Sequence, residues 1–134
     1  MTQEEKELLL IDLCARLPYK IMVKVNDTQG IMDEIDIPNE RIFVSSLNPF
    51  LYGKAKASWF TVNGDKIYPY LRPLSSMTKE ERYVYHFYCD YHYGVYFKTV
   101  WSIDWLNKHH FDYRGLIERG LAIEAPEGMY NLNK

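Results

Sequence analysis

Two histidines and a cysteine recur at three-residue intervals in the second half of the chain. His86, Cys89 and His92 carry imidazole and thiol groups, which are the ligands that zinc prefers. Positions i and i+6 differ by roughly 600° around a helix, so one helix cannot direct His86 and His92 at the same ion. Distant ligands such as Cys14 or His109 would have to complete a tetrahedral site. The spacing therefore favours side chains that pack in a half-buried helix, where a cysteine behaves as a small apolar residue.

A second cluster combines imidazole with a carboxylate. His109 and His110 precede Asp112, and a His–Asp pair can act as a general base. No serine or cysteine nucleophile stands in a recognisable turn nearby. Histidines also suit the end of a helix, and an aspartate suits the start of the next one. A small metal-dependent enzyme built on His86, Cys89, His109 and Asp112 therefore ranks third among the functions considered. For the two functions ranked above it, we expect no cofactor.

Size and composition restrict the class of protein. The chain has 134 residues, which fits one domain over residues 1–134, and 47% of them are hydrophobic. A net charge of −2 argues against a nonspecific nucleic-acid binder. Two cysteines do not make a disulfide framework, and no apolar run approaches the roughly 20 residues of a membrane span. We expect a cytoplasmic protein without a membrane segment.

The sequence of the first half of the chain predicts one helix followed by strands. Thr2 and an apolar stripe predict a helix over residues 3–16, which Pro18 ends. Alternating apolar residues then predict strands around a turn at residues 26–30, in which Gly30 can take a positive φ. Asn63-Gly64 between two further apolar runs predicts a hairpin.

The sequence of the second half of the chain predicts mainly helices. Thr78 and Glu81 form a capping box that predicts a helix over residues 79–93. Further helices are expected over residues 103–110 and 113–119, and residues 121–124 could return as a strand. The fold class is therefore α+β: an N-terminal helix, a small antiparallel curled sheet or partial barrel of four or five strands, then two or three C-terminal helices. The outline after residue 102 also fits a winged helix, but its recognition helix would carry few basic residues.

Aromatic residues dominate the segment 81–97. Eight of its seventeen residues are Phe or Tyr, and tyrosine suits interfaces because it joins a large apolar area to a polar tip. A helix that is aromatic nearly all round cannot bury every ring in one core stripe. We therefore predict a non-enzymatic module that binds a protein partner, including a second copy of itself. The predicted contact residues are Tyr83, Tyr85, Tyr88, Tyr91 and Trp105.

Nucleic-acid association is the alternative function. Residues 1–40 carry nine acids and four bases, whereas residues 52–82 carry six bases and three acids. Basic side chains beside exposed aromatic rings can bind a single strand by charge and base stacking. The residues predicted for this alternative are Lys54, Lys56, Trp59, Arg72 and Arg82.

Three blocks of the chain resemble a known group of proteins. They are Asp12-Leu-Cys-Ala-Arg-Leu-Pro-Tyr19, Tyr70-Leu-Arg-Pro-Leu-Ser-Ser-Met-Thr78 and the segment that runs from Asp104 to Tyr130. The sequences of these blocks are similar to those of a family of small uncharacterised proteins, encoded by gut anaerobes of the Bacteroides type and by their phages and mobile elements. The resemblance implies a bacterial or phage protein of the cytoplasm. It implies no activity and no catalytic residue.

Overall fold

The computed structural model describes residues 1–46, 57–90 and 95–130. Helix α1 spans Gln3–Arg16 and begins at a capping box, in which Thr2 and Glu5 exchange hydrogen bonds between side chain and backbone. Leu9 and Leu13, one turn apart, are buried against the sheet. A 3-10 turn over Leu17–Tyr19 ends the helix at Pro18. The N-terminal helix predicted over residues 3–16 is therefore confirmed.

Four strands follow as an antiparallel meander: β1 (Met22–Val25), β2 (Thr28–Asp36), β3 (Arg41–Ser46) and β4 (Ala57–Thr61). The first turn consists of two residues, and Asn26 adopts a positive φ of 53° there. Gly30 lies inside β2 instead of in the turn. A Cβ at Gly30 would stand 2.2 Å from the Ser45 carbonyl oxygen, so close approach of two backbones explains this glycine.

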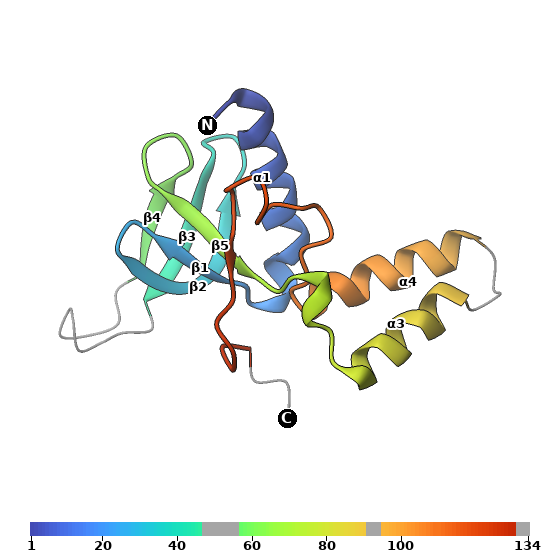
Figure 1. Ribbon diagram of the computed structural model, residues 1–134. Helices are drawn as coiled ribbons and strands as arrows, with labels where there is room; N and C mark the ends of the chain where they lie inside the picture. The colour runs from blue at the N-terminus through green and yellow to red at the C-terminus, as the bar shows by residue number, and fades with distance from the viewer. Residues whose placement is uncertain (47–56, 91–94, 131–134) are drawn as a thin grey trace.

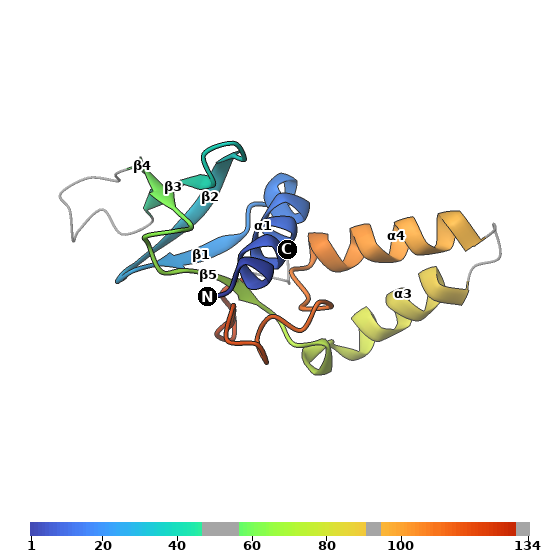
Figure 2. The same ribbon diagram turned by 90° about the horizontal axis from the view of Figure 1, so that it is seen from above.

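Strand β5 (Ile67–Leu71) pairs with β1 and not with β4, so the Asn63-Gly64 hairpin prediction is wrong. Three strands separate β4 from β5 in the sheet order, which in a flat sheet is about 19 Å. The connection is nevertheless compact, because the Asp65 amide donates to the Thr61 carbonyl at 2.9 Å. The sheet must therefore curl to bring these two strands together (Figure 2).

The sheet has six strands and is mixed, where four or five antiparallel strands were predicted. Strand β6 (Ile123–Glu124) runs parallel to β5 and completes the order β4-β3-β2-β1-β5-β6. Beyond β5, the Arg72 amide donates to the His110 carbonyl and the Asp112 amide to the Arg72 carbonyl, both at 2.8 Å. These bonds fasten the end of the second helical segment to the sheet. The α+β class stands.

Helix α3 (Lys79–Asp90) and helix α4 (Val95–Lys108) lie side by side and project from the sheet as a helical hairpin (Figures 1 and 2). The capping box of α3 is present, since the Glu81 amide donates to Thr78 Oγ1 at 3.1 Å. Helix α4 begins eight residues earlier than the helix predicted to start at Ile103. Residues 113–119 form turns and no helix, because Gly115 takes a positive φ and Asp112 accepts from two amides of the turn.

Two groups of buried side chains hold these parts together. The larger group joins α1 to the sheet and to Leu116, Leu121 and Ala122. The smaller group lies at the base of the helical hairpin and consists of Trp105, Leu106 and Phe111. In the part of the chain that the structure describes, no helix has the length and apolar character needed to cross a membrane.

Candidate functional site

The helical hairpin is packed at its base and exposed along its sides. Trp105 of α4 stacks against Tyr85 of α3 at a centroid distance of 5.8 Å and against Phe111 at 5.6 Å. Trp105 is only 9% exposed. These rings fix the two helices to each other and to the sheet, so the burial of the base leaves the outer sides of the helices for contact with solvent.

The structure separates the predicted contact residues. Tyr83 is 76% exposed, the largest value among the described large hydrophobic side chains. Tyr85 is half-buried and Trp105 is buried, so both serve the packing of the hairpin base. The side chains of Tyr88 and Tyr91 lie outside the described residues. Of the three predicted residues whose side chains the structure describes, Tyr83 is the one at an exposed helix position.

Other exposed apolar side chains lie on the same hairpin. Phe87 is one turn from Tyr83 and 51% exposed, and three residues of α4 are between 36% and 38% exposed. We call the five the hairpin surface: Tyr83, Phe87, Val100, Trp101 and Ile103. A helix that begins before residue 100 places Trp101 one turn before Trp105. This i, i+4 spacing is the sequence signal that could have placed Trp101 on the hairpin.

An open hollow of about 370 Å³ lies where α4 meets the turn after α1. It is lined by Tyr19, Trp101, Asp104, Trp105 and Lys108. Tyr19 is half-buried and Trp101 is 38% exposed, so both contribute accessible ring surface. We call this feature the α4 hollow. It combines aromatic rings with one carboxylate in the last turns of a helix, whose C-terminal end carries partial negative charge.

Of the residues predicted for nucleic-acid association, the three that the structure describes do not form one accessible basic face. Arg72 is 7% exposed, and Glu81 holds its guanidinium through two hydrogen bonds of 2.7 and 2.6 Å. Trp59 lies on β4 under the Arg41 guanidinium, on the opposite side of the sheet order from Arg72. Arg82 is exposed on α3, and Lys54 and Lys56 lie outside the described residues.

The candidate metal and catalytic residues that the structure describes are also dispersed. His86 is exposed on α3, and the side chain of Cys89 lies outside the described residues. His109 packs on Trp105 at 4.7 Å, and burial lowers the pKa of its imidazole. Asp112 accepts hydrogen bonds from the Leu116 and Ile117 amides. Within the described ranges, no three His, Cys, Asp or Glu side chains are placed to share a metal ion.

A buried charge network connects α1 to the hairpin base. Arg16 and Asp12 are both fully buried, and Arg16 Nε donates to Asp12 Oδ2 at 2.8 Å. Arg16 Nη2 also donates to the Phe111 carbonyl at 2.6 Å. Arg114 reaches Asp12 Oδ1 at 3.3 Å from the turn after α4. The network therefore ties three distant segments of the chain together.

The side chains of His110 and Tyr130 pack together where the sheet meets the segment after α4. Their rings stack at 3.9 Å, and the Tyr130 hydroxyl donates to the Tyr70 carbonyl while accepting from the Met22 amide. Burial, followed by the nearby charge of Arg16, lowers the pKa of His110 to about 3. Burial raises the pKa of Tyr130. Both side chains are therefore neutral near pH 7 and act as packing groups.

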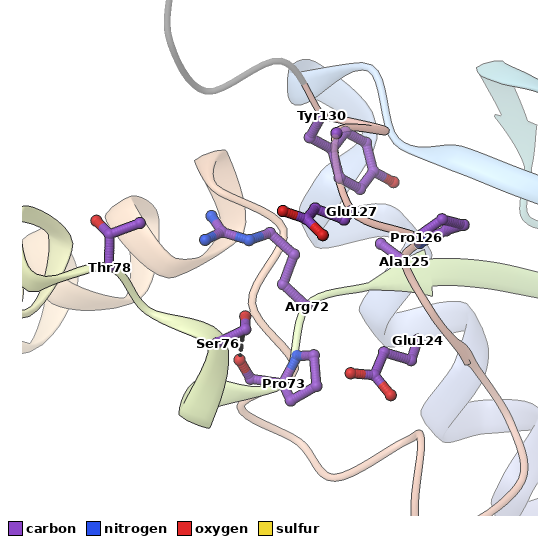
Figure 3. Close-up of a pocket in the computed structure, with 10 residues that line it drawn as sticks. Arg72, Pro73, Ser76, Thr78, Glu124, Ala125, Pro126, Glu127 and Tyr130 are labelled. Carbon is purple, nitrogen blue, oxygen red and sulfur yellow. Dashed lines mark hydrogen bonds between the residues drawn. The ribbon is translucent and has the colours of Figure 1, made fainter.

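The pocket in Figure 3 lies at the ends of β5 and β6 and measures about 560 Å³. Most of its polar lining is occupied within the chain. Arg72 is paired with Glu81, Thr78 caps α3, and the Ser76 hydroxyl donates to the Pro73 carbonyl at 2.7 Å. The carboxylates of Glu124 and Glu127 complete the rim. The convergent polar groups that a small-molecule site uses for orientation are thus committed to the fold.

Comparison with known proteins returns no match to a protein-family model, to a curated protein or to a solved structure. The resemblance to proteins of Bacteroides-type bacteria and their phages therefore stays a prediction. The residues and their geometry carry the functional argument that follows.

Proposed function

We propose that the chain is a non-enzymatic protein-binding module whose contact region is the hairpin surface. The observation that carries this proposal is the exposure of Tyr83, at 76%, on a helix that projects from the sheet. Phe87 and Trp101 extend the exposed aromatic area on the two helices. Aromatic side chains are enriched at protein interfaces because they bury a large area at low entropic cost.

The distribution of polar groups supports a binding role over a catalytic one. The described carboxylates with clear partners, such as Asp12 and Glu81, hold arginines inside the fold. His110 is neutral and buried, and Asp112 caps a turn. The best-formed polar arrangements among the described residues are therefore structural, whereas the most exposed large hydrophobic side chain among them is an aromatic ring on the hairpin.

Site-specific photo-crosslinking tests the proposal. A photoreactive phenylalanine analogue replaces Tyr83 in one protein and Ile37 in a control protein. Ile37 is 61% exposed in the turn after β2, so it reports on a comparable apolar site away from the hairpin. Illumination in cells is expected to yield one discrete adduct from position 83 and none from position 37. Equal yields at both positions, or adducts at neither, would overturn the proposal.

The mass of the adduct identifies the partner. A band at twice the mass of the chain would mean that the partner is a second copy, and another discrete mass would mean a different protein. A crosslink to nucleic acid, removed by nuclease, would replace the proposal with the alternative of nucleic-acid association.

A further inference from the structure

The buried apolar side chains of the described residues form two cores that have no residue in common. The larger core joins α1 to the sheet, whereas the smaller core lies at the base of the helical hairpin and contains Trp105, Leu106 and Phe111. Elements that share one core unfold together, but elements with separate cores can open at different free energies. The character of the boundary between the two cores therefore decides whether the hairpin opens by itself.

Charged side chains cross this boundary. Arg16 lies on α1 with the larger core, and it donates at 2.6 Å to the carbonyl of Phe111 in the smaller core. Its guanidinium carbon is also 5.4 Å from the ring centroid of Tyr113. We call the charged group at the boundary the arginine seam, which consists of Asp12, Arg16, Arg72, Glu81 and Arg114.

Arg72 fastens both helices of the hairpin to the end of β5. Its guanidinium donates to the two carboxylate oxygens of Glu81 in α3 and lies 4.2 Å from the ring centroid of Phe111. Its amide donates to the His110 carbonyl, and its carbonyl accepts from the Asp112 amide, both at 2.8 Å. One residue therefore holds the start of α3 and the segment after α4 against the sheet.

A charged boundary opens more readily than an apolar one. When a charged pair separates into water, both charges regain hydration, which offsets much of the attraction that is lost. Two atoms also gain from opening: Arg16 Nη1 and His110 Nδ1 are buried without a hydrogen-bond partner, so access to water would satisfy them.

The connection from the sheet into α3 allows the same movement. It contains a 3-10 turn over Leu74–Ser76, all three residues of which are exposed, so this turn can change direction without losing buried apolar area. We infer that the helical hairpin is hinged at the arginine seam and opens from the sheet as a unit, while α1 and the meander of β1 to β4 stay folded. Opening changes how the hairpin surface is oriented relative to the sheet.

Native-state hydrogen exchange of the purified full chain, at several low urea concentrations, tests the hinge. The amides of Arg72 and Asp112 report the seam, because their hydrogen bonds join the end of β5 to the segment after α4. The amides of Met32 and Val62 report the meander. We expect the protection of the seam amides to be at least about ten-fold weaker and to depend less steeply on urea, because opening the hinge exposes less surface than global unfolding.

Two variants distinguish a hinge from a single cooperative structure. Ile42→Val shortens a fully buried side chain of β3, so it should weaken protection of the meander amides roughly three- to ten-fold. It should leave the seam amides unchanged, because β3 stays folded when the hinge opens. Glu81→Gln should weaken protection of both sets, because its contact with Arg72 is lost in hinge opening and in global unfolding alike.

Three results would overturn the hinge. Equal losses at seam and meander amides in Ile42→Val would mean that the protein opens as one unit. Seam exchange that does not depend on urea, or that Glu81→Gln leaves unchanged, would mean local fluctuation without movement of the hairpin. No partner takes part in the exchange, so its outcome is independent of crosslinking at Tyr83 and of the proposed function.

Discussion

Trp59 and Trp101 are equally exposed, at 38%, but their surroundings differ. Trp59 on the outer strand of the sheet lies under Arg41, which is paired with Asp36. Trp101 on α4 lies beside Asp104 in a hollow that no described arginine lines. The comparison teaches that equal exposure does not mean equal surroundings: a guanidinium held within the sheet covers the Trp59 ring, whereas Trp101 lines an open hollow where α4 meets the turn after α1.

The ion pairs of the protein differ in depth, and depth sets their contribution to stability. Asp12 and Arg16 are fully buried, whereas the Arg41 side chain is 42% exposed. An unpaired buried charge costs far more than an unpaired charge in water. The predictions below move from the most deeply buried ion pair to the most exposed one.

The largest effect is expected at the buried pair. Asp12→Asn leaves the fully buried Arg16 guanidinium without its countercharge, so we expect the free energy of unfolding to fall by about 3–5 kcal/mol. Urea denaturation measures it. Asp104→Asn, the matched change at the open hollow, should stay within about 0.5 kcal/mol of the unaltered protein. Similar losses in both variants would remove the distinction between the two regions.

The pair between Arg72 and Glu81 should be intermediate. Glu81→Gln is expected to lower the free energy of unfolding by about 1.5–3 kcal/mol, because Arg72 loses a charged acceptor that binds it twice. Burial alone would raise the pKa of Glu81, but hydrogen bonds from Arg72 and Thr78 outweigh it and lower this pKa.

The stabilisation from ionised Glu81 is therefore present above pH 4.5 and is lost as the pH falls through the lowered pKa. The stability difference between Glu81→Gln and the unaltered protein should shrink over that acid range. A difference that stays constant from pH 6 to pH 3 would show that the pair does not depend on the charge of Glu81.

His110 should make stability depend on pH above that range. The folded protein keeps His110 neutral down to about pH 3, whereas the imidazole of the unfolded chain takes up a proton near pH 6.5. Stability should therefore be complete above pH 6.5 and fall as the pH decreases, by at most about 1.4 kcal/mol per pH unit from this group. His109, whose pKa is also lowered, acts in the same direction.

His110→Asn isolates this contribution. Asparagine tolerates the positive φ of 64° at this position and does not titrate. The slope of stability against pH between 6.5 and 4.5 should be smaller in the variant, whatever its stability at pH 7. An identical slope would assign the dependence to other groups.

Among the ion pairs considered, the smallest stability change is expected at Arg41. Arg41→Ala should lower the free energy of unfolding by about 1 kcal/mol or less, because the Arg41 side chain is 42% exposed and its charge is partly solvated. Urea denaturation measures the change. A loss above about 2 kcal/mol would contradict the assignment of this pair to the more exposed class.

The structural features that depend on interactions between residues close in the sequence could be predicted from it. The helix over residues 3–16 and the start of α3 follow from capping boxes at Thr2 and Thr78, whose partners lie three residues away. The pairing of β5 with β1 was missed because it joins residues more than forty positions apart, across a compact turn that looks like a hairpin. The residues of a turn do not determine which strand of the sheet the following strand pairs with.

The site was predicted only in part for the same reason. Tyr83 follows from the aromatic pattern of one helix. Trp101 was missed because the helix was expected to begin at Ile103, whereas α4 begins at Val95. Tyr19 reaches the hollow through the tertiary packing of α1 against α4, which leaves no signal in local spacing. Trp105 is aromatic and adjacent, but burial at the hairpin base assigns it to packing.

The most direct test is native mass spectrometry of the protein purified gently from the cells that make it, in parallel with Tyr83→Ser and Ile37→Ser. Our account predicts a complex heavier than 16.0 kDa for the unaltered protein and for Ile37→Ser, and its loss in Tyr83→Ser. A complex of unchanged abundance in Tyr83→Ser, or a single 16.0 kDa species in every sample, would contradict it.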